Sequence, residues 1–279
     1  MLTKNIGILL GLALLSVSHV HAADTRCHRE WLCLHTVNSN GFVEYQAENK
    51  RPFPLTLSFR FDTRNLKRLD TSPETLTLPG NEARVLARFK IINTGKPVRF
   101  KPVYDWVAGK LNAEHDDSVV YRLPYDSARA YSILQGYGGR FSHEGNERYT
   151  LDFNMRIGTP IHAARGGVVI DVVEHNDKGG WNPAFSRYAN YIVIEHEDGT
   201  TGEYYHLSKN GAFLDIGARV EEGQLIGLSG NTGHTAMPHL HFGVYRAAPW
   251  GQTISVPVSF KTREGVIDNP RRGRRYYAE

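Results

Sequence analysis

The amino-acid sequence is poor in cysteine and in net charge, and each shortage excludes a class of protein. Two cysteines among 279 residues are too few for a disulfide scaffold or a cysteine zinc finger. Lys and Arg outnumber Asp and Glu by 33 to 29, an excess too small to indicate nucleic-acid binding. Hydrophobic residues make up 41% and charged residues 22% of the chain, which is ordinary globular composition and excludes a disordered or fibrous protein.

Long hydrophobic runs are also missing, with one exception at the N-terminus. Lys4 precedes an apolar stretch over residues 6–17, and Val20-His21-Ala22 places small residues where a signal peptidase requires them. This pattern predicts a secretory signal peptide over residues 1–22. The alternative is an uncleaved anchor, but the run is shorter than the about 20 apolar residues of a spanning helix. We therefore expect an exported protein, periplasmic or secreted, with no stable membrane anchor after cleavage.

Export changes the interpretation of Cys27 and Cys33. In an oxidising compartment two nearby cysteines pair more often than they stay free, and closing so short a loop stabilises the fold by about 2 kcal/mol on the chain-entropy model. Two free buried thiols are the alternative. No motif that carries chemistry surrounds either cysteine.

The sequence predicts a mainly β protein in two halves. Leu55, Leu57, Phe59 and Phe61 alternate with other residues, which places them on one face of a half-buried strand. Several such runs, separated by Pro, Gly and Asn turns, predict a β-sandwich-like accessory domain over residues 23–124. The remainder is again rich in short strands and shows no long helical period. They are expected at residues 42–45, 55–61, 75–78 and 85–92, and then at 168–173, 191–195, 224–228 and 239–245.

The positive charge of the chain is concentrated at its end. Residues 261–279 hold six Lys or Arg against three acids, including Arg271, Arg272, Arg274 and Arg275. We expect this basic C-terminal tail to be a solvated end, although contact with an anionic surface is the alternative. The second domain is then expected over residues 125–260.

Histidine is the residue type that is present in excess, with 13 in the chain. His239 and His241 are separated by one residue in a segment with strand character, so their imidazoles point to the same face. Two imidazoles on a rigid strand suit a metal site, because little ordering entropy remains to be lost on binding. Alone, the pair is weak evidence, since surface histidines in alternation have the same spacing.

A second group lies upstream, where His143 in a loop is followed by Asp152 in an apolar run. A carboxylate between Leu151 and Phe153 is costly to bury without a partner. A salt bridge to Arg148 would satisfy it, and so would a metal ion. Two histidines and one aspartate, with a fourth position left to water, fit a catalytic zinc site.

A third segment, Tyr204-Tyr205-His206-Leu207, follows the Asp198-Gly199 turn. Taken alone, His206 is better interpreted as an ordinary half-buried histidine. Tyr204 shares a strand face with His206 in this interpretation, so it either helps to hold an oxyanion or is a core tyrosine.

Together these segments resemble the lysostaphin-type (LytM-like) zinc metallopeptidases, most of which are peptidoglycan endopeptidases. The resemblance runs in order from Gln135 to Val244, and the motifs that carry it are Gly158-Thr159-Pro160, Ala163-Ala164-Arg165-Gly166-Gly167, Tyr204-x-His206-Leu207, residues 217–227, and Gly230-x-Thr232-Gly233 followed by Pro238-His239-Leu240-His241-Phe242.

The resemblance implies one Zn²⁺ ion held by Asp152, His241 and a further histidine, with His206 and His239 as the catalytic pair. The usual first ligand lies four residues before the aspartate, where this chain has Arg148. A branch of the family instead has Ser-His in a longer loop, as in Ser142-His143, and so we assign His143 as the first metal ligand. His162 and His234 match no functional family position and are left as possible groove residues.

The resemblance therefore predicts an exported zinc endopeptidase that cuts peptide cross-links of peptidoglycan and binds no nucleic acid. The absence of a recognisable wall-targeting repeat favours the periplasm. The alternative is a non-catalytic relative that binds the wall or activates another murein hydrolase. Such relatives typically lack ligands, whereas this chain has all three.

Overall fold

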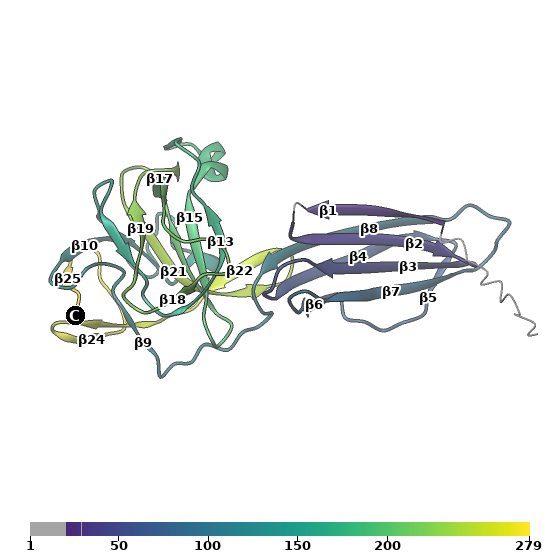
Figure 1. Cartoon of the computed structure of the whole chain (residues 1–279), viewed down its shortest axis with the longest axis horizontal. Helices are drawn as coiled ribbons and strands as arrows, with labels where there is room; N and C mark the ends of the chain where they lie inside the picture. The colour runs from purple at the N-terminus through teal and green to yellow at the C-terminus, as the bar shows by residue number, and fades with distance from the viewer. Residues whose placement is uncertain (1–20, 29) are drawn as a thin grey trace, which may run out of the picture.

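The computed structural model describes residues 21–28 and 30–279, so the expected signal peptide lies outside the described residues except for His21 and Ala22. Over the described part the chain is mainly β, as predicted, and its helical content is two 3₁₀ turns. No helix in that part is long and apolar enough to cross a membrane. Figure 1 shows the strands of the N-terminal half at one end of an elongated molecule and the later strands at the other.

The N-terminal half is a sandwich of two antiparallel sheets. One sheet has the order β1-β2-β3-β7-β5 and the other the order β6-β4-β8. The strands are β1 (His21–His28), β2 (Leu32–Ser39), β3 (Phe42–Asn49), β4 (Leu55–Arg64), β5 (Leu66–Arg68), β6 (Thr75–Leu78), β7 (Ala83–Ile91) and β8 (Arg99–Ala108).

Alternation along β4 builds the sandwich core. Leu55, Leu57 and Phe59 are fully buried and pack with residues of the facing sheet such as Tyr45. Cys27 and Cys33 form a disulfide between paired positions of β1 and β2, so the predicted pairing is confirmed. The bond closes the outer edge of the larger sheet.

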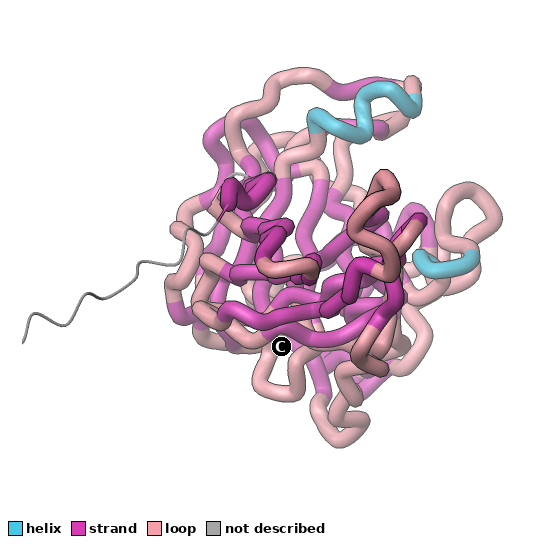
Figure 2. The backbone as a smooth tube through the Cα atoms, turned by 90° about the vertical axis from the view of Figure 1, so that its right-hand side faces the viewer, coloured by secondary structure: helices cyan, strands magenta, loops and turns pink. Residues whose placement is uncertain are grey.

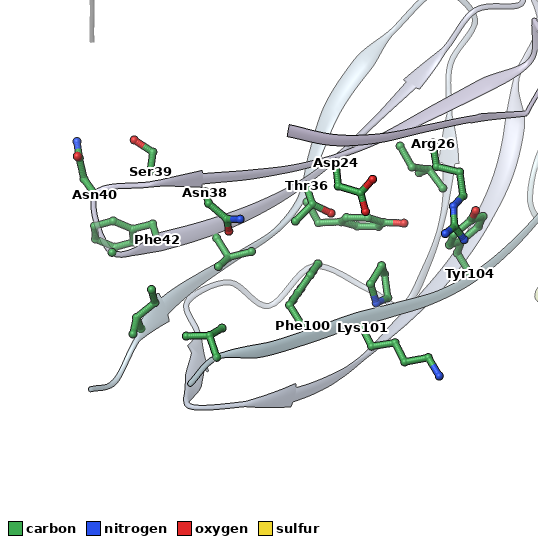
Figure 3. Close-up of a pocket in the computed structure, with 17 residues that line it drawn as sticks. Asp24, Arg26, Thr36, Asn38, Ser39, Asn40, Phe42, Phe100, Lys101 and Tyr104 are labelled. Carbon is green, nitrogen blue, oxygen red and sulfur yellow. The ribbon is translucent and has the colours of Figure 1, made fainter. Parts of the chain in front are cut away.

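A hollow of about 920 Å³ opens between the two sheets of this half. Figure 3 shows that Arg26, Thr36 and Tyr104 line it, together with Phe100 at the side of β8. None of the described residues that line it is a histidine. The hollow therefore offers no imidazole for metal binding or proton transfer.

The second half is built on a nine-stranded sheet in which β18-β13-β15-β16-β21-β11-β10-β25 follow one another and β22 pairs with β21. Smaller sheets, β12-β19-β17 and β24-β23-β9, pack around it. Figure 2 shows the two short 3₁₀ turns on the outside of the strands. The elements are β9 (Val120–Arg122), β10 (Ala130–Gln135), η1 (Gly145–Glu147), β11 (Thr150–Phe153), β12 (Pro160–His162), β13 (Gly167–Val173), β14 (Gly179–Gly180), η2 (Pro183–Tyr188), β15 (Tyr191–Glu195), β16 (Thr201–Tyr205), β17 (Leu207–Ala212), β18 (Arg219–Val220), β19 (Leu225–Ser229), β20 (Gly233–His234), β21 (Leu240–Ala248), β22 (Gln252–Ser255), β23 (Ser259–Thr262), β24 (Gly265–Ile267) and β25 (Arg275–Tyr277).

The register of the central sheet decides which side chains meet. Asp152 on β11 lies opposite His241 on β21, and Tyr205 on β16 lies opposite His241 from the other side. Their neighbours Leu240 and Phe242 point to the opposite face and are buried in the core. One face of the sheet thus forms the core while the other presents the polar residues.

Two expectations about organisation differ from the structure. Tyr121 on β9 belongs to the core of the second half and β9 pairs with β23, so the second core begins before residue 125. The expected solvated end at residues 261–279 is wrong, because β25 pairs with β10 and Ala278 is buried. Tyr276 and Ala278, which follow the arginines and which charge counting overlooks, pack on the core and fix this segment to the sheet.

Candidate metal centre

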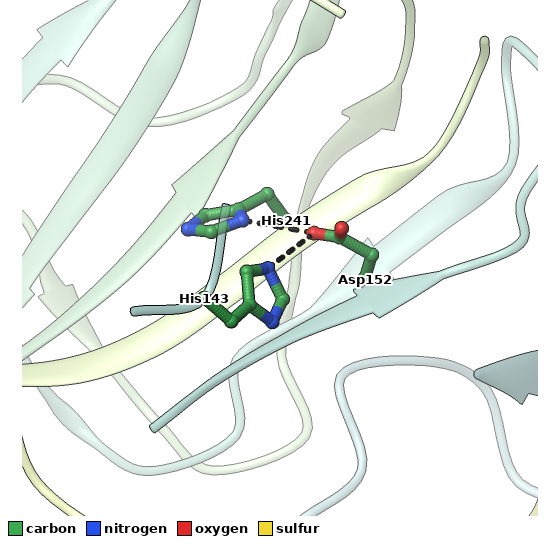
Figure 4. Close-up of side chains that lie close together, drawn as sticks. All are labelled: His143, Asp152 and His241. Carbon is green, nitrogen blue, oxygen red and sulfur yellow. Dashed lines mark hydrogen bonds and ion pairs between the residues drawn. The ribbon is translucent and has the colours of Figure 1, made fainter. Parts of the chain in front are cut away.

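Three side chains from distant parts of the sequence converge on one point. His143, Asp152 and His241 each offer a ligand atom, and these atoms all lie within 4.8 Å of one another. Asp152 Oδ1 is 3.2 Å from His143 Nε2 and 2.9 Å from His241 Nδ1. Figure 4 shows both imidazoles directed at the same carboxylate oxygen. The residues that the sequence proposed as ligands are thus brought together.

The loop that carries His143 is held by Gln135 at the end of β10. The side-chain amide of Gln135 donates to Ser142 Oγ at 2.8 Å and to Asp152 Oδ2 at 3.2 Å. Its carbonyl oxygen accepts from the backbone N–H of Phe141 at 3.0 Å. Gln135 is buried, and it links the His143 loop to the strand that carries Asp152.

Hydrogen bonds fix which nitrogen each ligand imidazole offers. His143 Nδ1 lies 3.1 Å from the carbonyl oxygen of Gly136. Because a carbonyl can only accept a hydrogen bond, Nδ1 carries the proton, and the unprotonated Nε2 is the atom that can bind a metal ion. His241 is reversed. Its Nδ1 faces Asp152, while Nε2 is 3.3 Å from the Tyr245 hydroxyl, which donates to Glu147 Oε2 at 2.6 Å. A carboxylate placed behind a ligand histidine in this way fixes its tautomer and raises its basicity.

The electrostatics of the centre favour a cation. Burial raises the pKa of Asp152, but hydrogen bonds from His143 and His241 outweigh burial and hold that pKa well below its usual range. Burial lowers the pKa of His241, but the hydrogen bond to Asp152 and the nearby carboxylate of Glu147 outweigh burial and raise the pKa to about 9. His143 is fully buried, and its Nε2 lies 3.2 Å from Asp152 Oδ1. Two imidazole nitrogens and a carboxylate are a donor set that fits Zn²⁺.

His206 and His239 form a pair beside these three residues. Their ring centroids are 4.5 Å apart, and His239 Nε2 lies 3.6 Å from Asp152 Oδ1. His206 Nδ1 donates to the carbonyl of Thr232 at 2.7 Å, and His239 Nδ1 donates to the carbonyl of Met237 at 2.7 Å. Both rings therefore leave Nε2 free to accept a proton. Burial, together with the neighbouring imidazoles, lowers the pKa of His206 to about 3.

His206 lies just beyond β16 with a φ of +66°, a conformation that non-glycine residues rarely adopt and that costs energy. The turn breaks the strand alternation, so His206 and Tyr204 do not share a face. Tyr204 is fully buried, and its hydroxyl accepts from the backbone N–H of Ala164 at 2.8 Å. Of the two interpretations of Tyr204, the core tyrosine is correct and the oxyanion role is wrong. Arg148 lies over the Tyr149 ring and is not the partner of Asp152.

A groove of about 870 Å³ leads to the centre. Its lining includes Asp152, His206, His239 and His241, and also Trp181, His234 and Phe141. Phe141 stacks on Trp181 with ring centroids 4.8 Å apart, although both residues are more than 60% exposed.

Most of the groove lining is not predicted by the sequence. His234 is an exception, since it is a possible groove residue in the sequence and does line the groove, with its ring centroid 4.7 Å from that of Trp181. Arg271 and Arg272 also line the groove, where the sequence predicted a solvated end. The only signal available for Phe141 was its place beside Ser142-His143, and Trp181 lies in a segment with no matching motif.

Part of this chain is similar to known peptidases. Residues 146–254 match the model of Peptidase family M23. The chain is 33% identical over 169 residues to peptidoglycan DD-endopeptidase ShyA of Vibrio cholerae serotype O1, covering 59% of this chain and 36% of that protein. It is 34% identical over 141 residues to glycyl-glycine endopeptidase ALE-1 of Staphylococcus capitis, covering 50% of this chain and 36% of that protein.

Among solved structures, the catalytic domain of lysostaphin from Staphylococcus simulans is 30% identical and is matched with a TM-score of 0.33, covering 50% of this chain and 88% of that chain. The chain spans 36% of the length of ShyA and of ALE-1. The similarity to these two relatives therefore concerns about a third of each protein.

Proposed function

Because residues 146–254 of this chain are a domain of peptidase family M23, of the lysostaphin type, we propose that the protein is an exported, zinc-dependent endopeptidase that hydrolyses peptide cross-links of bacterial peptidoglycan. The observation that carries the proposal is the convergence of His143, Asp152 and His241 on one point, with His206 and His239 paired beside it. A non-catalytic relative would have no need to keep both groups.

The chain's own residues would hold the metal through His143 Nε2, one oxygen of Asp152 and His241 Nδ1. When bound there, Zn²⁺ supplies Lewis-acid activation of water and of the scissile carbonyl. Tyr245 and Glu147 keep the proton of His241 on Nε2, away from the metal side. The side-chain amide of Gln135 bonds both to Ser142 in the His143 loop and to the carboxylate of Asp152, so it holds these two ligands in position relative to each other.

His206 and His239 would move the protons of the reaction. Each imidazole has its Nδ1 proton committed to a backbone carbonyl, so Nε2 is the atom that takes a proton from the attacking water and returns one to the leaving amine. Burial and the neighbouring imidazoles lower the pKa of His206, so this ring is neutral at pH 7. General acid–base catalysis of this kind contributes about 10²- to 10⁴-fold in rate.

The substrate class follows from the relatives. ShyA is named a peptidoglycan DD-endopeptidase and ALE-1 a glycyl-glycine endopeptidase, so peptide cross-links of the cell wall are the shared target. Such a target lies outside the cytoplasmic membrane, which is consistent with the signal peptide predicted over residues 1–22.

The test is a digest of isolated wall sacculi by the zinc-loaded protein, with the released fragments identified by mass spectrometry. We expect new amino termini at cross-links. The variant His206→Asn should lower kcat by about 10²- to 10⁴-fold at unchanged zinc content. His162→Gln is the matched control, because His162 is half-buried, bonds to the carbonyl of Gly223 and does not line the groove.

The non-catalytic alternative predicts a different outcome. A protein that only binds the wall, or activates another hydrolase, would leave cross-links intact at full zinc occupancy. In that case His241→Ala would also leave its wall binding unchanged. Intact cross-links at full zinc occupancy would refute the proposed activity.

A further inference from the structure

Three arginines line the groove, and their charge is not matched by acids. Arg140, Arg271 and Arg272, which we call the basic wall, are among the lining residues, whereas Asp152 is the one carboxylate among the described residues of the lining, and that carboxylate already lies beside two imidazoles. All three arginine side chains are exposed. Within residues 21–28 and 30–279, no salt bridge joins them to an aspartate or glutamate. The wall therefore presents three arginines to whatever enters the groove.

The backbone under two of these arginines is fixed to the sheet. In the C-terminal turn (residues 268–274), Gly273 N–H donates to the carbonyl of Ile133 at 2.8 Å, and Ile133 N–H donates to the carbonyl of Arg274 at 2.9 Å. Arg271 N–H donates to the Tyr276 hydroxyl at 3.0 Å. The backbone of residues 271–274 is thus bonded to β10 and to Tyr276, while the side chains of Arg271 and Arg272 are exposed.

The turn also lies against the loop that presents a metal ligand. A Cβ on Gly136 would be 2.5 Å from the carbonyl oxygen of Pro270, so only glycine allows this approach. The carbonyl of Gly136 in turn fixes His143. The backbone that carries Arg271 and Arg272 is therefore packed against the loop that holds His143. The positions of these two charges are fixed relative to the candidate metal centre, and so relative to a peptide bond cut there.

The chemistry of these side chains selects a kind of ligand. A guanidinium presents a rigid fork of donors that matches a carboxylate, and like charges gathered in a groove attract an anion and focus it there. Wall cross-links fall into two chemical classes in this respect. Stem peptides that are joined directly carry free carboxylates beside the linking bond, whereas oligoglycine bridges are uncharged.

We propose that Arg271 and Arg272, together with Arg140, bind a free carboxylate of the stem peptide and make the protein selective for directly joined, carboxylate-bearing cross-links over oligoglycine bridges. This inference rests on the proposed function, because it names the substrate of the same groove. The arginines act as specificity residues, and they take no part in proton transfer.

The experiment uses the full zinc-loaded chain and soluble cross-linked peptide dimers in two forms, with the carboxylates free and with them converted to carboxamides. For the double variant Arg271→Gln/Arg272→Gln we expect KM on the free-carboxylate dimer to rise about 10- to 100-fold, the loss typical of charge-assisted hydrogen bonds. The value of kcat and the zinc content should stay unchanged. On the amidated dimer the variant and the wild type should have the same KM.

Arg274→Gln is the matched control, because Arg274 is exposed in the same turn but does not line the groove. A double variant with wild-type KM on the free-carboxylate dimer, or a wild type that cuts oligoglycine-bridged wall equally fast, would overturn the inference while leaving the endopeptidase activity established. A wild type that cuts neither kind of wall would refute the proposed function itself, and the inference with it.

Discussion

Two consecutive hydrogen bonds, from His241 to Tyr245 and from Tyr245 to Glu147, allow a prediction that depends on one atom, the Tyr245 hydroxyl oxygen. Tyr245 is buried, and its hydroxyl is the acceptor 3.3 Å from His241 Nε2. The variant Tyr245→Phe removes this oxygen and leaves the ring. If His241 binds the metal through Nδ1, its Nε2 proton then loses the acceptor that orients the imidazole.

The magnitude follows from what remains around His241. Loss of an outer partner of a metal-bound histidine costs about 10- to 100-fold in metal affinity, which corresponds to about 1.4 to 2.7 kcal/mol. Glu147 Oε2 lies 3.8 Å from His241 Nε2 and its side chain is 44% exposed, so it can move to replace the hydroxyl in part. We therefore expect about a 10-fold loss for Tyr245→Phe, and about 100-fold when Glu147→Gln is added.

The assay is zinc affinity, measured by competition with a chelating dye at neutral pH. Tyr125→Phe is the matched control, because Tyr125 is fully buried and its hydroxyl donates to the carbonyl of Tyr276 at 2.7 Å, away from the candidate ligands. The control should lose about 1 kcal/mol of unfolding free energy and keep its zinc affinity. If both Tyr245→Phe and the double variant bind zinc within threefold of the wild type, the assignment of the Nδ1 atom as ligand is refuted.

Three further predictions concern stability and substrate binding. Burial lowers the pKa of His196 to about 4, below its value of about 6.5 in an unfolded chain. As the pH falls, the unfolded state takes up the proton first, so the free energy of unfolding should fall by about 3 kcal/mol between pH 6.5 and 4. Denaturant unfolding of His196→Gln at the two pH values should lack this contribution. Trp181→Ala should raise KM several-fold at constant zinc content, because it removes the exposed ring that stacks on Phe141, and unchanged kinetics would show that the pair does not contact substrate. Replacing Cys27 and Cys33 by serine should lower the unfolding free energy by about 2 kcal/mol without changing zinc affinity, since the disulfide lies in the N-terminal sandwich; dye competition would reveal any coupling.

Local pattern was sufficient for the eight strands that the sequence predicts, and the expected strand at residues 191–195 coincides with β15. The expectation of a half-buried strand at residues 55–61 was wrong, because Thr56 and Ser58 are buried as well as Leu55, Leu57 and Phe59. The pattern failed where pairing is long-range. The three residues of β9 have no distinguishing period, and only pairing with β23, more than a hundred residues later, places them in the second core.

The site was predictable where its residues lie on strands and less so elsewhere. Asp152 and His241 are neighbours because β11 and β21 pair in register, and the spacing of His239 and His241 shows in the sequence. The sequence could not decide whether Tyr204 and His206 share a face, because side chains alternate between faces only within a continuous strand. The positive φ of His206 ends the strand before that residue. No local rule predicts such a turn at a histidine between Tyr205 and Leu207.

The C-terminal turn explains why charge counting was misleading. Counted along the sequence, its arginines form a basic end of the kind that is usually solvated. In the fold, the hydroxyl of Tyr125 bonds to the backbone of Tyr276, and Pro270 packs against Gly136, so the apolar residues of the segment fix it and the arginines are left on the groove side. The hydrophobic effect therefore sets where the charge lies, and the charge then determines which anions reach the candidate metal centre. A solvated tail of the same composition would have neither the fixed position nor the adjacency to the His143 loop that such a selection requires.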